Sequence, residues 1–243
     1  MNSINILGIN INTFTKKQAL IKIKEFLNGG KHHFITTPNP EIILAADNDK
    51  EFFSILNKAD LSLPDGVGLK IAAWLMGVNF QRITGADLLK DILALAEARN
   101  RRVAILNWQD GLSSAANIQK VLADKYPKLR ALAVDIGRQA IMPEEKLAQV
   151  KEFKPEIIFL TLGAPYQEKF IFHNLAKLPS VKIGLGVGGA FDFLIGKLPR
   201  APLWFRKIGL EWLWRLFKQP ARWKRIYNAV IVFPVKFIVW RFK

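Results

Sequence analysis

The sequence has no cysteine among its 243 residues and only three histidines. The lack of cysteine excludes disulfides, thiol nucleophiles and cysteine metal sites, and it fits a reducing compartment. The histidines are scattered and form neither a triad nor a zinc site. The Gly-x-x-x-x-Gly-Lys-Ser/Thr phosphate loop and the Gly-x-Ser-x-Gly nucleophile motif are also missing. The chemistry must therefore come from carboxylates, amides and basic side chains.

Long hydrophobic runs are missing as well. The first residues lack a basic stretch followed by a long apolar run and a small-residue cleavage site, so we expect a cytoplasmic protein without a signal peptide. Residues 226–240 are apolar but are interrupted by Asn228, Pro234 and Lys236. Because a membrane span needs roughly 20 apolar residues, we expect this stretch to lie in the membrane interface.

Acidic residues are few, with 20 Asp and Glu against 36 Lys and Arg, a net charge of +16. Between Arg200 and Lys243 there are eleven basic residues, one acid (Glu211) and five of the seven tryptophans. This mixture is typical of segments at a membrane interface. It predicts an α/β core at residues 1–199 and a basic, Trp-rich helical appendage at residues 200–243 that associates with an anionic membrane surface.

Apolar strand patterns alternate with helical patterns through most of the chain. The strand patterns cover residues 33–36, 103–106, 129–135, 156–162 and 181–187, and residues 4–11 alternate like a hairpin or a first strand with its return. Such alternation is typical of an α/β fold, a Rossmann-like, mostly parallel sheet flanked by helices.

Asp65 is the candidate catalytic base. It lies in Pro64-Asp65-Gly66, between a short apolar run and a helical pattern. In α/β proteins the reactive groups collect where strands end, so a carboxylate on such a turn points into the cleft. The same tripeptide is also a common tight turn, but three other clusters of polar residues and glycine follow strands in this chain.

Two stretches suggest sugar or phosphate binding. Thr37 and Asn39 follow the strand at residues 33–36, where they can orient a ligand or cap the next helix. Arg82 precedes a helix start at Thr84, a setting that suits an anion such as a diphosphate. An exposed arginine is otherwise simply solvated.

The other clusters follow the last two strands. Gln167 and Lys169 head a helix, where they can reach a sugar or phosphate. After the final strand, a glycine-rich loop can bring the ribose and phosphates of a nucleotide close to backbone amides. Its candidate nucleotide-binding residues are Gly186, Gly188, Gly189 and Asp192. The loop is not a dinucleotide fingerprint, because no βαβ unit follows it.

Asp47-Asn48-Asp49 matches the Asp-x-Asp that holds a divalent metal in many sugar-nucleotide transferases. Here it lies between two helical patterns and has no further oxygen ligands nearby. We therefore expect these carboxylates to be solvated helix caps, and we expect neither a metal nor a cofactor.

Taken together, the clusters resemble the WecG/TagA/CpsF family of glycosyltransferases, which includes the N-acetylmannosaminyltransferases of teichoic acid and enterobacterial common antigen synthesis. The resemblance spans nearly the whole chain. The matching stretches are Thr37-Pro38-Asn39-Pro40-Glu41, Pro64-Asp65-Gly66-x-Gly68, Arg82-x-x-Gly85-x-Asp87, Leu162-Gly163-Ala164-Pro165-x-Gln167-Glu168-Lys169, Gly186-Val187-Gly188-Gly189-x-Phe191-Asp192 and Gly209-Leu210-Glu211-Trp212-Leu213-x-Arg215.

The resemblance implies a membrane-associated, inverting, metal-independent enzyme peripheral to the inner face of the cell membrane. Such an enzyme moves an N-acetylhexosamine-type sugar, such as N-acetylmannosamine, from a UDP donor to a polyprenyl diphosphate-linked N-acetylglucosamine. By position, Asp65 resembles the base. The implied pocket residues are Thr37, Asn39, Arg82 and Gln167, and the arginines implied to approach the diphosphate are Arg215, Arg222 and Arg225.

One departure from the family pattern concerns the donor contact. After Gly137, where relatives more often carry an aromatic residue, this chain has Arg138. The rival interpretation of the basic tail is a nucleic-acid or membrane-surface binding protein without catalysis; the resemblance implies no nucleic-acid partner. The sequence leaves open whether the chain forms a homo-oligomer.

Overall fold

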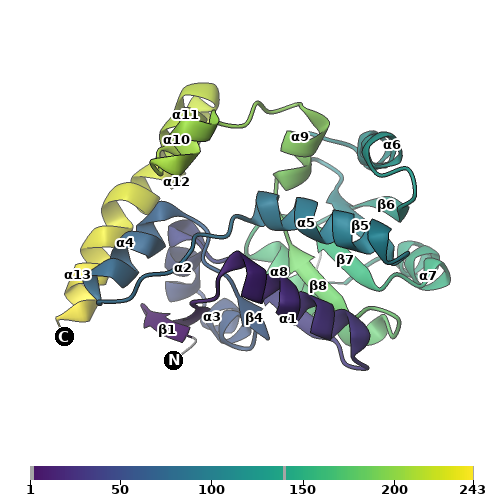
Figure 1. Cartoon of the computed structure of the whole chain (residues 1–243), viewed down its shortest axis with the longest axis horizontal. Helices are drawn as coiled ribbons and strands as arrows, with labels where there is room; N and C mark the ends of the chain where they lie inside the picture. Colours follow the sequence, from purple (N-terminus) through teal and green to yellow (C-terminus); the bar gives the residue numbers. More distant parts are fainter. Residues whose placement is uncertain (1–2, 139–140, 243) are drawn as a thin grey trace.

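A computed structural model describes residues 3–138 and 141–242 (Figure 1). Its centre is a six-stranded parallel sheet in the order β4-β3-β8-β7-β5-β6, which confirms the expected α/β fold. The strands are β3 (His33–Thr36), β4 (Leu61–Ser62), β5 (Arg102–Trp108), β6 (Arg130–Ile136), β7 (Ile157–Leu160) and β8 (Ile183–Gly186). A separate antiparallel hairpin joins β1 (Ser3–Ile6) to β2 (Ile9–Asn12), as the alternating pattern predicts.

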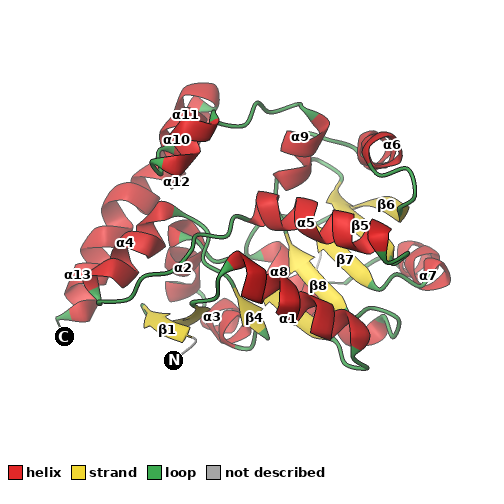
Figure 2. Ribbon diagram, in the orientation of Figure 1, coloured by secondary structure: helices red, strands yellow, loops and turns green. Residues whose placement is uncertain are grey.

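Helices cover both faces of the sheet (Figure 2). One face packs against α1 (Lys16–Asn28), α5 (Gly85–Ala98), α6 (Ala115–Lys125) and α9 (Ala190–Ile195). The other packs against α3 (Lys50–Asn57), α7 (Glu144–Phe153) and α8 (Tyr166–Asn174), which the 3-10 turn η1 (Leu175–Lys177) follows. In β5, Val103 and Ile105 enter one core while Ala104 and Leu106 enter the other. Burial on both faces explains why the strands are continuous apolar runs.

Short polar side chains fix where several helices begin. Thr15 forms a capping box with Gln18 at the start of α1, and Asp49 accepts the amide of Phe52 at the start of α3. Thr84 caps α5 by accepting the amide of Asp87, as predicted. Such caps satisfy amides that have no partner within the helix. Ser114 caps α6, which begins at Ala115, by accepting the amide of Asn117.

A third core cluster lies beside the sheet, under the hairpin. It unites β1 and β2 with α2 (Pro40–Asp47), α3 and α4 (Val67–Leu75). The end of the chain closes it, because Phe233 and Phe237 are buried there.

The tail, residues 200–242, leaves the sheet beyond α9 and then runs along one side of the molecule to the C-terminus (Figure 1). Its elements are α10 (Leu203–Lys207), α11 (Glu211–Lys218), η2 (Pro220–Arg222), α12 (Trp223–Tyr227), the π-helical η3 (Asn228–Val232) and α13 (Phe233–Arg241). Pro220 divides the tail helices. The described residues contain no helix both long and apolar enough to cross a membrane. The boundary at residue 200 stays a prediction. Because α13 packs on the third core cluster, the end of the tail is part of the core packing.

Candidate active site

A pocket of about 360 Å³ opens where the carboxyl ends of β3, β5, β7 and β8 meet the tail. It is the cleft at which parallel α/β sheets bind ligands. All of the candidate site residues line it except Arg82: Thr37, Asn39, Asp65, Gln167, Gly186, Gly188, Gly189, Asp192, Arg215, Arg222 and Arg225. The predicted gathering of these side chains into one cavity is therefore what the structure shows.

Asp65 follows β4 and is fixed by two backbone contacts. Its Oδ2 accepts a hydrogen bond from the amide of Gly85 at 3.1 Å, and its own amide donates to the carbonyl of Pro38 at 2.8 Å. Burial raises the pKa of Asp65 above its usual range, opposed by the Gly85 hydrogen bond and the charges of Arg215 and Arg82. A carboxylate that holds a proton more readily than usual suits a general base.

Thr37 and Asn39 reach the pocket from the loop after β3. The Asn39 side chain accepts the amide of Ile42 at 2.9 Å and so caps α2, which confirms the capping alternative while leaving the residue on the pocket wall. Thr37 is buried beside the first turn of α5, where a Cβ on Gly85 would lie 3.2 Å from its hydroxyl. Glycine at position 85 thus lets α5 approach the β3 loop closely.

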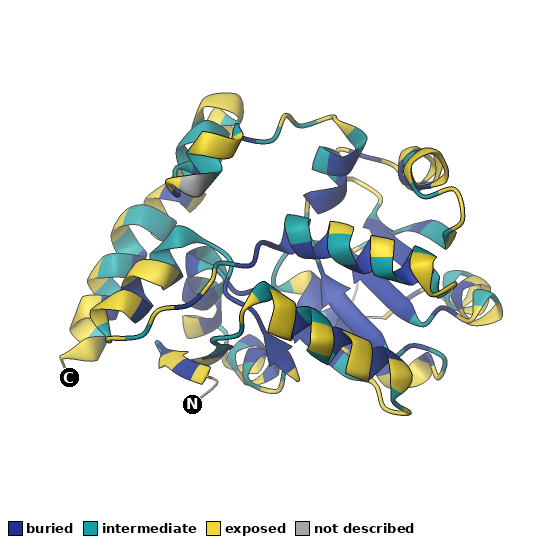
Figure 3. Cartoon of the chain, viewed as in Figure 1, coloured by how far each residue is buried: buried dark blue, intermediate teal, exposed yellow. Residues whose placement is uncertain are grey.

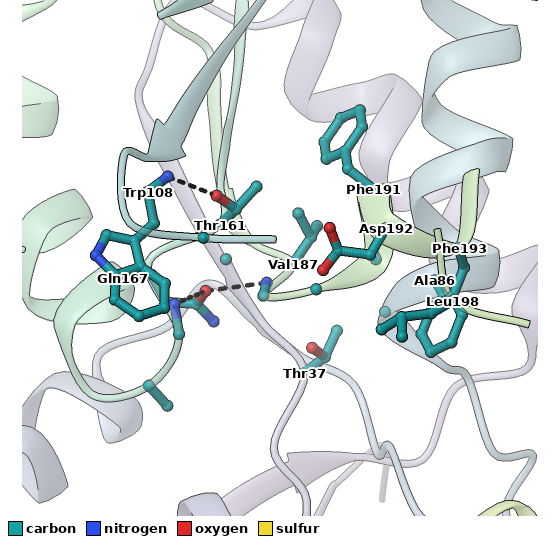
Figure 4. A pocket seen from close by; sticks show the side chains of 18 of the residues that line it. Thr37, Ala86, Trp108, Thr161, Gln167, Val187, Phe191, Asp192, Phe193 and Leu198 are labelled. Carbon is teal, nitrogen blue, oxygen red and sulfur yellow. Dashed lines mark hydrogen bonds between the residues drawn. The ribbon is translucent and has the colours of Figure 1, made fainter. Parts of the chain in front are cut away.

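Gln167 lies on α8 between two glycine loops (Figure 4). Its Oε1 accepts the amide of Gly163 at 3.1 Å and that of Gly188 at 3.0 Å, and its Nε2 donates to Glu168 at 2.8 Å. Because one side-chain oxygen of Gln167 accepts from both loops, the residue holds the two loops in place. Gly186 permits this arrangement, because a Cβ there would collide with the Gln167 amide.

Two residues of the sequence hypothesis do not line the pocket. Arg82 pairs with Glu211 at 3.4 Å and does not line the cavity. Lys169 pairs with Asp49 at 2.8 Å and with Glu51 at 2.6 Å, so it does not reach a ligand there.

The tail supplies three arginines to the pocket. Arg225 donates to Glu41 at 2.6 Å, and Arg215 lies 3.6 Å from Glu211. Burial lowers the pKa of Arg222 to about 10, helped by the charges of Arg225 and Arg215. Mutual repulsion of this kind is relieved by an anion, and guanidinium groups match phosphate oxygens bidentately.

Glu211 joins the tail to the core. It is buried and lines the pocket, and its two oxygens face Arg82 of the core and Arg215 of its own helix. Arg200 makes a second link, donating to Asp87 at 2.6 Å and to Thr84 at 3.2 Å. These ion pairs hold the tail arginines over the cavity.

The far end of the pocket is built from the loops after β5, β7 and β8. Asp192 accepts a hydrogen bond from the Ser113 hydroxyl at 2.6 Å, beside the glycine loop. The hydroxyl of Thr161 accepts the amide of Trp108 and donates to Asn107, each at 2.8 Å (Figure 4). Sequence reasoning missed Asn107, Trp108 and Thr161, although their position at the ends of strand patterns was a usable signal.

The comparison with protein families agrees with this geometry. The model described as "Glycosyl transferase WecG/TagA/CpsF family" matches residues 4–243, which is nearly the whole chain. The chain belongs to the WecG/TagA/CpsF family of glycosyltransferases. As a member of that family it is a glycosyltransferase, and the expectation drawn from its motifs is confirmed.

Three relatives of this family member carry the same name, N-acetylglucosaminyldiphosphoundecaprenol N-acetyl-beta-D-mannosaminyltransferase. One from Bacillus subtilis is 33% identical over 80% of this chain and 75% of the relative. Another, from Bacillus spizizenii, is 34% identical over 84% of this chain and 78% of the relative. A third, from Staphylococcus aureus, is 31% identical over 92% of this chain and 86% of the relative.

In this WecG/TagA/CpsF family member, Arg138 lies against two aromatic rings. The Arg138 guanidinium lies 3.5 Å from the centre of the Trp108 ring and 5.1 Å from that of Tyr166. Its Nε donates to the carbonyl of Leu162 at 2.7 Å. The arginine therefore presents a flat, cationic surface on the pocket wall.

Proposed function

We propose that the chain transfers N-acetylmannosamine from a UDP donor to N-acetylglucosamine linked through a diphosphate to a polyprenyl lipid. The named relatives act on an N-acetylglucosaminyl-diphosphoundecaprenol acceptor, and the family and identity support the same reaction class here. One observation carries the proposal: a half-buried carboxylate and three clustered arginines face the same cavity. An acceptor with a sugar hydroxyl and a diphosphate needs both, a carboxylate to take the hydroxyl proton and arginines to bind the diphosphate.

In the proposed reaction, Asp65 takes the proton of the acceptor hydroxyl. The oxygen then attacks the anomeric carbon of the donor sugar, whose bond to UDP breaks with its electron pair on the departing phosphate. A single displacement of this kind inverts the anomeric centre and forms no covalent enzyme intermediate. The amide of Gly85 fixes one carboxylate oxygen, so the base keeps its orientation.

The acceptor diphosphate would lie against Arg215, Arg222 and Arg225. Two of these have acidic neighbours, Glu41 beside Arg225 and Glu211 beside Arg215, whereas Arg222 meets two like charges and the amide oxygen of Gln219. Fixed positive charges in a partly buried site stabilise phosphate charge more strongly than they would in water.

The donor nucleotide would occupy the other end of the pocket. There the loop from Gly186 to Gly189 brings backbone amides close to the cavity, and Asp192 can accept hydrogen bonds from a ribose. Thr37, Asn39 and Gln167 lie between the two ends, where the sugars would meet. Arg82 would act through Glu211, not through direct contact with the diphosphate.

Metal independence is part of the proposal. Asp49 is a helix cap that pairs with Lys169, and Asp47 pairs with Lys236. The described residues hold no group of three or more acids or histidines with metal-site geometry. We expect the backbone amides of the glycine loop at the donor end to stabilise the departing UDP in place of a cation, so activity should survive EDTA. Complete loss with chelator that magnesium or manganese restores would contradict this part.

We further propose that the protein is peripheral to the inner face of the cell membrane, where a lipid-linked acceptor presents its headgroup. The test of the reaction is a panel of UDP-sugars with a short-chain lipid diphosphate-linked N-acetylglucosamine. Transfer should be fastest with UDP-N-acetylmannosamine. A preference for another UDP-sugar would correct the donor, and no transfer from any UDP-sugar would refute the proposal.

A further inference from the structure

Helix α4 is a core element with an exposed apolar face. Its buried side carries Leu69, Ala72 and Ala73, whereas Ile71, Trp74 and Leu75 are 52%, 70% and 53% exposed. These three residues are spaced i, i+3 and i+4, so they share one stripe of the helix. A lone exposed apolar side chain is ordinary, but a stripe marks an interaction surface.

Helix α13 of the tail packs beside α4 (Figure 1). Its buried side carries Phe233 and Phe237, and its other side exposes large apolar residues at the same helical spacing: Val235, Ile238, Val239 and Phe242. Both helices show long exposed stretches in Figure 3. The buried sides of α4 and α13 meet in the third core cluster, which leaves the two apolar stripes outside it.

The charges of the two helices select the kind of partner. Neither α4 nor α13 contains an acidic residue. Lys70 adjoins the stripe on α4 and Arg241 ends α13, and both are exposed. Lys236 is committed to Asp47. Apolar stripes with tryptophan and flanking cations fit a bilayer of anionic lipid, in which rings lie at headgroup depth.

The position of α4 connects this surface to the pocket. Gly66, with φ at +104°, is the N-cap of α4 and directly follows Asp65. The N-terminal end of α4 is packed tightly, since a Cβ on Gly68 would lie 2.8 Å from Pro40 and a Cβ on Gly209 would lie 2.8 Å from Val67. α4 has nine residues, so it spans about 13 Å from the base to its exposed end.

We propose that Ile71, Trp74 and Leu75 of α4, together with the apolar stripe of α13, form one surface that docks on an anionic bilayer. The surface deepens the proposed function and rests on it, because a lipid-linked acceptor would have its diphosphate near the headgroups. With α4 seated on the bilayer, the helix sets the distance between the headgroups and Asp65. The core domain, and not the tail alone, thereby orients the pocket toward the acceptor.

The natural absence of cysteine allows a direct test. A Leu75→Cys variant of the full chain, labelled with an environment-sensitive fluorophore, is mixed with vesicles of phosphatidylglycerol and phosphatidylcholine. We expect the emission to shift to the blue with these vesicles and to change little with pure phosphatidylcholine. The matched control is Ile21→Cys on α1, which is also an exposed apolar position and should not respond.

A second measurement uses Ile71→Gln/Leu75→Gln. This variant should bind the anionic vesicles at least tenfold more weakly, whereas Ile21→Gln should bind like the wild type. Both should turn over a water-soluble, short-chain acceptor at the wild-type rate, because neither position lies in the pocket.

Three results would overturn the docking surface: a silent label at position 75 on protein that binds vesicles, a full chain that does not bind vesicles, or a label that responds to protein concentration without lipid. The last would assign the stripe to a second copy of the chain. If the label enters the bilayer but no sugar is transferred in any assay, the proposed function fails while the surface stands.

Discussion

The core wall of the pocket, formed by the loops after β3, β4, β7 and β8, is fixed by hydrogen bonds to backbone amides, whereas the tail wall, formed by α11, η2 and α12, gathers three arginines beside fewer acids. On the core wall, Gln167 holds two glycine loops and Gly85 holds Asp65. On the tail wall, burial and neighbouring arginines lower the pKa of Arg222. The core wall is thus held by its own hydrogen bonds, and we expect an anion to neutralise the excess positive charge of the tail wall.

The largest expected effect is on the core wall, at the base. Asp65→Asn keeps the size of the side chain and can still accept the Gly85 amide, so fold and donor binding should persist. Turnover should fall about 10²- to 10⁴-fold, because the general base is lost. Single-turnover transfer measures the loss of rate, and UDP binding measures whether the donor site persists.

Asp124→Asn, an exposed aspartate of α6, is the matched control and should behave as the wild type. Transfer by Asp65→Asn at nearly the wild-type rate would remove Asp65 from the chemistry.

The second prediction concerns Glu168, which accepts a hydrogen bond from Gln167 of the core wall. Burial raises the pKa of Glu168 to about 7 from 4.5. The folded protein therefore holds this proton, and the stability that it contributes is lost as pH rises from about 4.5 through about 7. Glu168→Gln abolishes that loss. Its free energy of unfolding should exceed that of the wild type by about 3 kcal/mol at pH 8 and by about 1 kcal/mol at pH 5.

Denaturant unfolding at the two pH values measures this difference, with exposed Glu152→Gln as control. Because the amide oxygen of the Glu168→Gln side chain can still accept from Gln167, transfer should continue. A variant no more stable than the wild type at pH 8 would show that burial does not raise the pKa of Glu168.

The third prediction concerns the tail wall. Arg222→Ala/Arg225→Ala should lower kcat/KM about 10- to 100-fold on a soluble, short-chain diphosphate acceptor, the size expected for losing charge-assisted hydrogen bonds. Lys218→Ala/Lys224→Ala removes the same charge from exposed positions of the same segment and should cost much less on that acceptor. Equal losses in the two pairs would mean that only overall charge matters.

The smallest expected effect couples the two walls. With Asp65 as the proposed base, activity should require its ionised form and should decline as pH falls through a pKa that burial has raised above the usual aspartate range. Among the charges that act on Asp65, Glu211 raises its pKa. Glu211→Gln should therefore move the acidic limb of kcat/KM to lower pH, by less than about one unit. A limb that moves to higher pH would contradict the coupling.

Local patterns in the sequence were enough to predict the sheet, most helix starts and the gathering of polar loops. Strand runs such as residues 103–106 and caps such as Thr84 are decided by near neighbours. The side-chain direction of Arg82 was not predictable in this way, because its partner Glu211 lies 129 residues away. Thr161 and Asn107 likewise meet only once β5 and β7 are aligned.

The tail shows the same limit. Its composition indicated a basic, Trp-rich helical appendage at a membrane interface. The sequence did not show that Phe233 and Phe237 would pack beneath the hairpin, since apolar side chains fit a protein core and a membrane interface equally well. The third core cluster decides between these environments for the two residues.

The most direct test of the central claim, that the core carboxylate and the tail arginines act on one acceptor, compares two acceptors in two proteins. The acceptors are N-acetylglucosamine on a short-chain lipid diphosphate and the same sugar on a short alkyl chain without phosphate. The wild type should prefer the diphosphate acceptor about 10- to 100-fold in kcat/KM, and Arg222→Ala/Arg225→Ala should lose most of that preference while keeping its rate on the alkyl glycoside. A double variant that keeps the full wild-type preference would contradict the claim.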